Sequence, residues 1–155
     1  MFLVCGDPSD PSTHYAGFDK SQVSPISCPD NICFDAKGNL WIATDGQQST
    51  LDRRDGFLAV PVDGPERGRL AQFMESVEGS EVCGPEFTPD GTTAFLAIQH
   101  PGEGSDYASQ STRWPDGKGA PRPSVIAVQA ESGGPIGVRG GASLISRRDL
   151  FARKS

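Results

Sequence analysis

A repeated block is the feature that most constrains how this chain can fold. Residues 34–38 read Phe-Asp-Ala-Lys-Gly, and residues 87–91 read Phe-Thr-Pro-Asp-Gly. A short apolar run follows each block, at residues 40–43 and 94–97. Two apolar strands around a glycine-containing turn predict a tight β-hairpin. A hairpin that recurs after about 50 residues is typical of the blades of a β-propeller.

Further strand candidates complete this pattern. Residues 56–62 and 69–76 lie between the two hairpins. The second segment is also compatible with a helix, but its short, glycine-bounded sequence favours a strand. Residues 2–5 and 124–129 add two more strands. We therefore predict an all-β chain of about two to three propeller blades, which is an incomplete propeller because a closed ring takes about 4–8 blades.

Long loops separate these strands. The 155 residues include 19 glycines and 13 prolines, a combined share well above the ~12% of average proteins. Both residue types interrupt regular structure, so turns and loops are expected. Residues 6–29 and 100–123 are predicted as long loops, which in compact domains are usually functional. We assign residues 1–129 to the partial propeller and residues 130–155, where periodicity ends, to a flexible tail.

Charge and cysteine spacing exclude several classes of function. The 14 basic and 20 acidic side chains give a net charge of −6, and a nucleic-acid binder would show a basic face instead. The four cysteines form no CxxC pair and the two histidines complete no zinc spacing. Free thiols are therefore favoured over disulfides. No run approaches the ~18 apolar residues of a membrane span, and without a signal peptide the chain as written would stay cytoplasmic.

Polar side chains gather at the ends of the first hairpin. Asp30 and Asn31 precede its first strand, and Asp45 follows its second. A hairpin brings these two ends together, and their oxygen atoms suit Ca²⁺, which takes oxygen ligands at ~2.3–2.6 Å. The alternative is that these side chains only cap turns through local hydrogen bonds. The nearby Arg53-Arg54-Asp55 is interpreted as a charged surface turn.

The second hairpin carries corresponding groups. Glu81 precedes its first strand, whereas Glu86 is expected to face differently because side chains alternate along a strand. Gln99, His100 and Glu103 follow its second strand. His100 has the chemistry to bind a metal or to donate to a phosphate group. The alternatives are exposed carboxylates and a histidine that hydrogen-bonds within a turn.

These blocks together resemble the PhoX family of bacterial alkaline phosphatases. The resemblance covers residues 1–129 and rests on three blocks in the same order, at residues 28–46, 81–91 and 99–103. The last block, Gln-His-Pro-Gly-Glu, is the most family-like of the three. A single hairpin of the first kind would not be specific, since many propellers carry one.

The resemblance implies a six-bladed propeller with iron and calcium in its channel and hydrolysis of phosphate monoesters in the periplasm or outside the cell. It implies that Glu81, rather than Glu86, is a metal ligand. The remaining positions that it assigns are Asp30, Asn31 and Asp45 as further metal ligands, and His100, Gln99 and Glu103 as catalytic residues lining the same site.

The family is several times longer than this chain, and its N-terminal part, with much of the iron site, has no counterpart here. We therefore expect a C-terminal fragment that requires the other half of the propeller and is inactive alone. One alternative is a calcium-binding, gluconolactonase-like propeller, against which the block at residues 99–103 argues. The other is a non-enzymatic remnant that packs against a partner.

Overall fold

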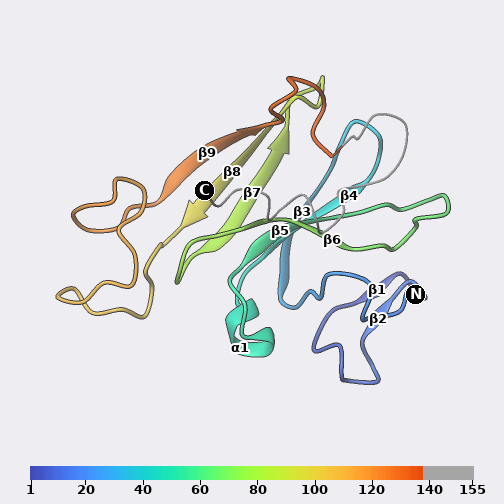
Figure 1. Cartoon of the computed structure of the whole chain (residues 1–155), viewed down its shortest axis with the longest axis horizontal. Coiled ribbons are helices and arrows are strands. Elements are labelled where there is room, and N and C mark those ends of the chain that lie inside the picture. Colours follow the sequence, from blue (N-terminus) through green and yellow to red (C-terminus); the bar gives the residue numbers. More distant parts are fainter. Residues whose placement is uncertain (138–155) are drawn as a thin grey trace.

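The computed structural model describes residues 1–137, which form three antiparallel sheets and one short helix (Figure 1). The all-β fold that the sequence predicts is confirmed. The elements, in chain order, are β1 (Leu3–Val4), β2 (His14–Tyr15), β3 (Pro29–Phe34), β4 (Leu40–Thr44), α1 (Gln47–Leu51), β5 (Gly56–Val60), β6 (Ala71–Glu75), β7 (Glu81–Phe87), β8 (Thr93–Gln99) and β9 (Ser124–Gln129).

The first blade is a four-stranded sheet with the order β3-β4-β5-β6. Its first hairpin forms because Asp35 organises the turn: Oδ1 accepts hydrogen bonds from the backbone N–H groups of Lys37 at 2.9 Å and Asn39 at 3.0 Å. Gly38 takes a φ of 82°, which glycine adopts without strain. Ile32 then pairs with Ile42 across the hairpin. The strand predicted at residues 69–76 is confirmed as β6.

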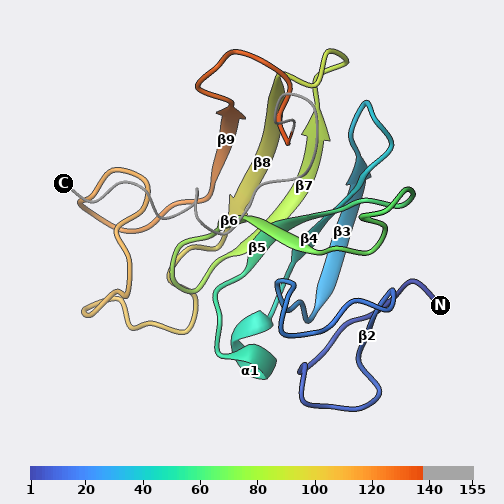
Figure 2. The same cartoon turned by 45° about the vertical axis from the view of Figure 1, so that its right-hand side comes forward.

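The second blade is a three-stranded sheet with the order β7-β8-β9, in which the second predicted hairpin supplies β7 and β8. Strand β7 packs against β3 and β4 of the first blade, and the two larger sheets lie side by side in both views (Figures 1 and 2). The backbone N–H of Gly84 donates to Oδ1 of Asn31 at 2.9 Å across this junction. The edge strands β3 and β7 of the two blades are therefore joined directly.

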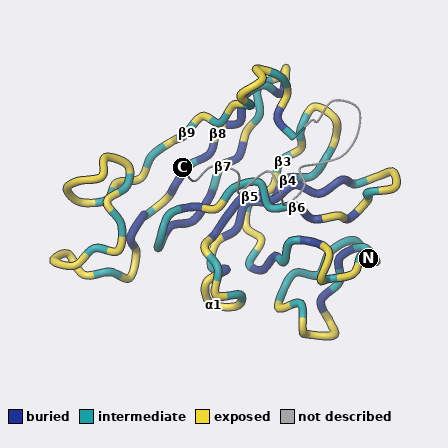
Figure 3. Tube along the Cα trace, viewed as in Figure 1, coloured by how far each residue is buried: buried dark blue, intermediate teal, exposed yellow. Residues whose placement is uncertain are grey.

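A core of buried side chains fills the space between the two blades. Trp41 lies at its centre, with ring centroids 4.9 Å from Phe57 and 5.1 Å from Phe87. Leu96 and Ile98 of β8 belong to the same cluster. Figure 3 shows the buried stretches running along these strands. This shared core fixes the relative position of the strand ends, and the candidate site lies at one such end.

The N-terminal segment covers the other face of the first blade. Tyr15, Ile26 and Leu70 form a second buried cluster with Leu58 and Val60 of β5. Part of the loop predicted at residues 6–29 is thus a strand, β2, which pairs with β1. Two-residue strands carry too little pattern for sequence periodicity to detect.

Two regions of sheet remain open among residues 1–137: the β3 edge of the face that the N-terminal segment covers, and the face of the second blade that points away from the shared core. On β3, Ile32 is 61% and Phe34 58% exposed, and on the second blade Phe95 is 42% and Val125 73% exposed. Isolated exposed apolar residues are normal. Here, however, Ile32 and Phe34 are neighbours on one face of β3, and Phe95 and Val125 share one face of the second blade.

The connections and the chain end complete the description. Residues 100–123 connect β8 to β9 through turns and one isolated bridge, as predicted for a long loop. Within the predicted tail, Ile136 is buried and its N–H donates to the carbonyl of Gly91 at 2.8 Å, while residues 138–155 lie outside the described residues. In the described part of the chain, no helix has the length and apolarity to cross a membrane.

Candidate metal centre

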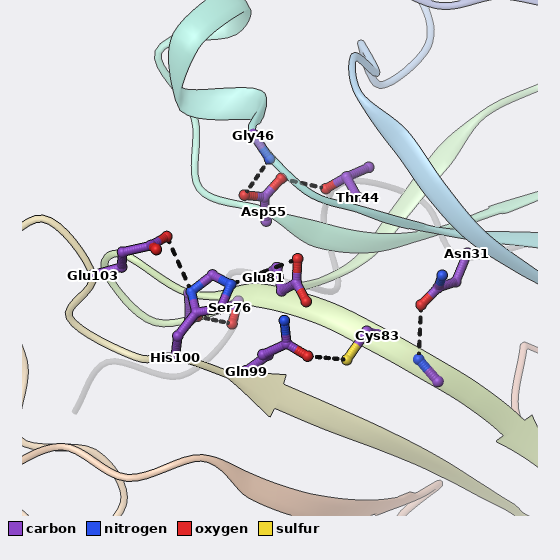
Figure 4. A network of polar contacts seen from close by, with 12 residues as sticks. Asn31, Thr44, Gly46, Asp55, Ser76, Glu81, Cys83, Gln99, His100 and Glu103 are labelled. Atoms are coloured by element: carbon purple, nitrogen blue, oxygen red, sulfur yellow. Dashed lines mark hydrogen bonds and ion pairs between the residues drawn. The ribbon is translucent and has the colours of Figure 1, made fainter.

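Three potential metal ligands converge where the two blades meet. Asp45, Glu81 and His100 each offer one ligand atom, and these atoms lie within 4.8 Å of one another. Asp45 follows β4 of the first blade, whereas Glu81 begins β7 and His100 follows β8 of the second. Strand pairing places Glu81 opposite Gln99, so His100 comes next to Glu81 (Figure 4).

His100 lies between two carboxylates. Its Nε2 is 3.7 Å from Oε2 of Glu81, and its Nδ1 is 3.2 Å from Oε2 of Glu103. The Nδ1 atom is buried and makes no hydrogen bond of good geometry among the described residues. The backbone φ of His100 is 33°, a left-handed conformation that is uncommon for residues other than glycine and is found at functional sites.

The electrostatics of Glu81 favour a cation. The Glu81 side chain is only 8% exposed. Burial raises the pKa of its carboxyl group, the adjacent Asp45 carboxylate raises it further, His100 lowers it, and the charge of Asp30 adds a smaller upward shift. The buried carboxylate of Glu81 and the exposed carboxylate of Asp45 repel one another, and a bound cation would relieve that repulsion.

The other predicted residues occupy different positions. Asp30 is exposed on β3, and the side-chain oxygen of Asn31 already accepts the bond from Gly84. Gln99 is exposed, and its Oε1 accepts a hydrogen bond from Sγ of Cys83 at 3.4 Å. The structure therefore brings together three of the predicted residues, with a fourth, Glu103, beside the imidazole.

Glu86 lies away from the three ligands, but simple strand alternation does not explain this: a register shift between Cys83 and Glu86 leaves Glu81 opposite Gln99 and Glu86 opposite Phe95, on one face of the sheet. It is exposed on β7 and is not part of the three-residue group. Glu81, five residues earlier on the same strand, is the carboxylate that the fold buries beside His100.

One residue of the site was missed at the sequence level. Asp55, interpreted as part of a charged surface turn, is 8% exposed and hydrogen-bonds Thr44 and Gly46 on both sides of Asp45. Its position directly before the strand β5 was the one signal available. Sequence spacing does not reveal that this strand end faces the loop after β4.

The donor set narrows the choice of ion. Two carboxylates and one imidazole suit iron and similar transition metals, whereas Ca²⁺ takes oxygen ligands alone. The nearby Cys83 is not one of the three converging ligands, and burial, with the charge of Glu81 next, raises the pKa of its thiol. All four cysteines are free and partly buried, in agreement with the preference for free thiols.

Two comparisons with known proteins, one against family models and one against solved structures, match the chain to PhoX. The family model described as alkaline phosphatase PhoX matches residues 1–102. Among solved structures, the chain is similar to Pseudomonas fluorescens PhoX in complex with vanadate, a transition state analogue, at 34% sequence identity and a TM-score of 0.66. The match covers 87% of this chain and 23% of that chain. No curated protein matches.

Proposed function

The chain belongs to the PhoX family of alkaline phosphatases, and we propose that it forms one wall of a metal-dependent site that hydrolyses phosphate monoesters. The convergence of Asp45, Glu81 and His100 on one point is the observation that carries this proposal. Because the chain spans 23% of the solved relative, the other walls of the site would come from further blades.

Asp45, Glu81 and His100 would hold one metal ion, with iron preferred for this donor set and calcium at more exposed carboxylates such as Asp30. A bound cation supplies positive charge that neutralises the phosphoryl oxygens of the ester. Glu103 would orient His100 through Nδ1, in the way that carboxylates orient metal-bound imidazoles.

The charges of the site explain why a cation comes before the substrate. Asp45, Glu81 and Glu103 are acidic, and they surround the single imidazole of His100. Without a cation, these carboxylates would repel a phosphate monoester dianion at close range. The amide of Gln99, exposed at the same end of β8, would donate a hydrogen bond to a phosphoryl oxygen of a substrate held at this site.

The open regions of the two sheets are where the remaining blades would pack. Ile32 and Phe34 on one side, and Phe95 and Val125 on the other, are apolar and exposed. In this fold, packing between blades buries such faces. Trp41 and Leu96 are buried in this way at the junction between the two blades here. We propose the N-terminal half of the propeller as this partner, in a periplasmic or secreted setting.

The test uses the purified full chain and two variants. Titration with Fe²⁺ or Mn²⁺ under anaerobic conditions, and separately with Ca²⁺, measures binding by calorimetry, and p-nitrophenyl phosphate measures turnover. Glu81→Gln should abolish transition-metal binding, because it removes a buried charged ligand. Glu86→Gln is the matched control, since it makes the same change at an exposed position of the same strand and should bind like the wild type.

The outcomes separate the competing functions. Metal binding without turnover indicates one wall of a site that needs the other blades, and turnover indicates that these blades suffice. No metal binding, or equal binding by the Glu81→Gln variant, contradicts the proposal and favours a non-enzymatic remnant. Hydrolysis of a δ-lactone in place of the phosphate ester would favour the gluconolactonase-like alternative.

A further inference from the structure

A buried carboxylate brackets the loop that carries Asp45. Oδ1 of Asp55 accepts hydrogen bonds from Oγ1 of Thr44 at 2.8 Å and from the N–H of Gln47 at 3.0 Å. Its Oδ2 accepts from the N–H of Gly46 at 2.8 Å. The two oxygens of Asp55 thus hold the residues on either side of Asp45, as Figure 4 shows for Thr44 and Gly46.

Neighbouring bonds extend this arrangement to the rest of the blade. Thr44 Oγ1 also accepts the N–H of Gly56 at 3.0 Å, which ties the end of β4 to the start of β5. Gln47, itself buried, accepts from the N–H of Ser27 and donates to the carbonyl of Arg54. Three chain segments therefore meet around Asp55.

Further restraints on this loop lie on the carbonyl of Gly46, which accepts hydrogen bonds from the N–H and Oγ of Ser49. Asp55 is thus the side chain that holds both neighbours of Asp45. Gly46 has a φ of 107°, a conformation that glycine adopts freely and that by itself gives the loop no rigidity. The N–H of Asp45 donates to the carbonyl of Cys28 at 3.0 Å, but that bond fixes only the backbone on one side. The Asp45 side chain is exposed, so packing does not restrain it.

We propose that Asp55 is a positioning residue that holds Asp45 in place for metal binding at the centre shared with Glu81 and His100. This inference rests on the metal centre of the proposed function. Asp55 is not itself one of the metal-ligating residues. It positions Asp45 by accepting hydrogen bonds from the hydroxyl and backbone N–H groups of the neighbouring residues. A ligand displaced by about 1 Å degrades a metal site, and loss of an outer-shell partner typically lowers metal affinity 10–100-fold.

The experiment compares full-length variants by calorimetric titration with Mn²⁺ and by thermal unfolding without metal. Asp55→Asn keeps the shape of the side chain but replaces one accepting oxygen with an N–H₂ group. That group faces hydrogen-bond donors, so at least one bond to the loop is lost. Thr44→Val removes one donor to Asp55 and the acceptor of the Gly56 N–H without changing the net charge, so a loss of affinity in this variant is not Coulombic. Asp52→Asn is the matched control, because Asp52 is exposed, lies three residues away and has a left-handed backbone that Asn tolerates.

We expect Asp55→Asn to weaken Mn²⁺ binding about 10–100-fold and Thr44→Val to weaken it by a smaller factor, while Asp52→Asn binds like the wild type. Folded Asp55→Asn protein that binds Mn²⁺ within twofold of the wild type overturns the inference. A lowered unfolding temperature with unchanged affinity means a purely structural role, which also overturns it. If Asp55→Asn does not fold, the Thr44→Val titration decides.

The result also separates this inference from the proposed function. If Asp45→Asn binds Mn²⁺ as tightly as the wild type, the metal centre itself is wrong, and a positioning role for Asp55 falls with it. If Asp45→Asn loses binding while Asp55→Asn and Thr44→Val retain it, the centre stands and only the role of Asp55 is refuted.

Discussion

Leu96 is expected to be among the most sensitive positions for stability. This residue of β8 is 1% exposed and packs in the core between the two blades. Leu96→Ala removes three carbons, which costs about 2.4 kcal/mol at about 0.8 kcal/mol per buried methylene group. The cavity left behind adds to this cost, so we expect a loss of about 3–4 kcal/mol in the free energy of unfolding, within the usual range of about 2–5 kcal/mol.

Phe95 provides a matched control on the same strand. It is adjacent in sequence but lies on the opposite face of the sheet and is 42% exposed. We expect Phe95→Ala to cost less free energy of unfolding than Leu96→Ala in the isolated chain, because a partly exposed side chain loses less buried surface on truncation. The cost should increase when the blade that covers this face is present.

Urea unfolding followed by circular dichroism measures both variants. A change of 1 kcal/mol shifts the melting temperature by about 2–4 °C in a domain of this size, so thermal scans should show the melting temperature of Leu96→Ala lower by about 6–16 °C. Equal losses in the two variants, or a larger loss in Phe95→Ala, would refute the assignment of the two faces of β8. A changed urea m-value would indicate that the blades unfold separately.

Two further predictions concern the backbone and pH. Gly79→Ala should lower the free energy of unfolding, measured in urea, by at least about 1 kcal/mol more than Gly104→Ala does. Both glycines have positive φ, but of the two only Gly79 would bring a Cβ close to the backbone of Glu103, at 2.7 Å. Hydrogen bonds from neighbouring threonines lower the pKa of Asp90 from 3.8, so its ionised form contributes stability above that pH, which is lost as the pH falls below it. Asp90→Asn should therefore reduce stability more at pH 6 than at pH 3, and an equal reduction at both would contradict this reading.

The hairpins were predictable because their signals are local. The turn at residues 35–39 contains the aspartate that hydrogen-bonds its own loop and the glycine that takes a positive φ. The repeat around residues 87–91 provided the second copy, and two hairpins one period apart predicted blades. His14 and Tyr15 escaped prediction because a two-residue strand is defined by its partner, β1, and not by its own pattern.

The candidate site was predictable in part for the same reason. Placing polar residues at hairpin ends is local reasoning, and it selected Asp45, Glu81 and His100 by residue type and position. Asp45 meets Glu81 and His100 only because the two blades dock through Trp41 and its neighbours. Residue spacing in the sequence contains no information about this docking. Asp55 was missed because its burial depends on tertiary contacts with the loop after β4.

The junction between the blades also has a consequence for how the chain folds. Asp45 belongs to one sheet, and Glu81 and His100 belong to the other, so their ligand atoms meet only after the two sheets have docked. By thermodynamic linkage, any ion that binds all three favours the docked state by RT ln(1 + [L]/Kd). The contacts within each hairpin are short in sequence, while the bond from Gly84 to Asn31 spans 53 residues. Ion binding should therefore appear as the last kinetic phase of refolding, after both sheets have formed.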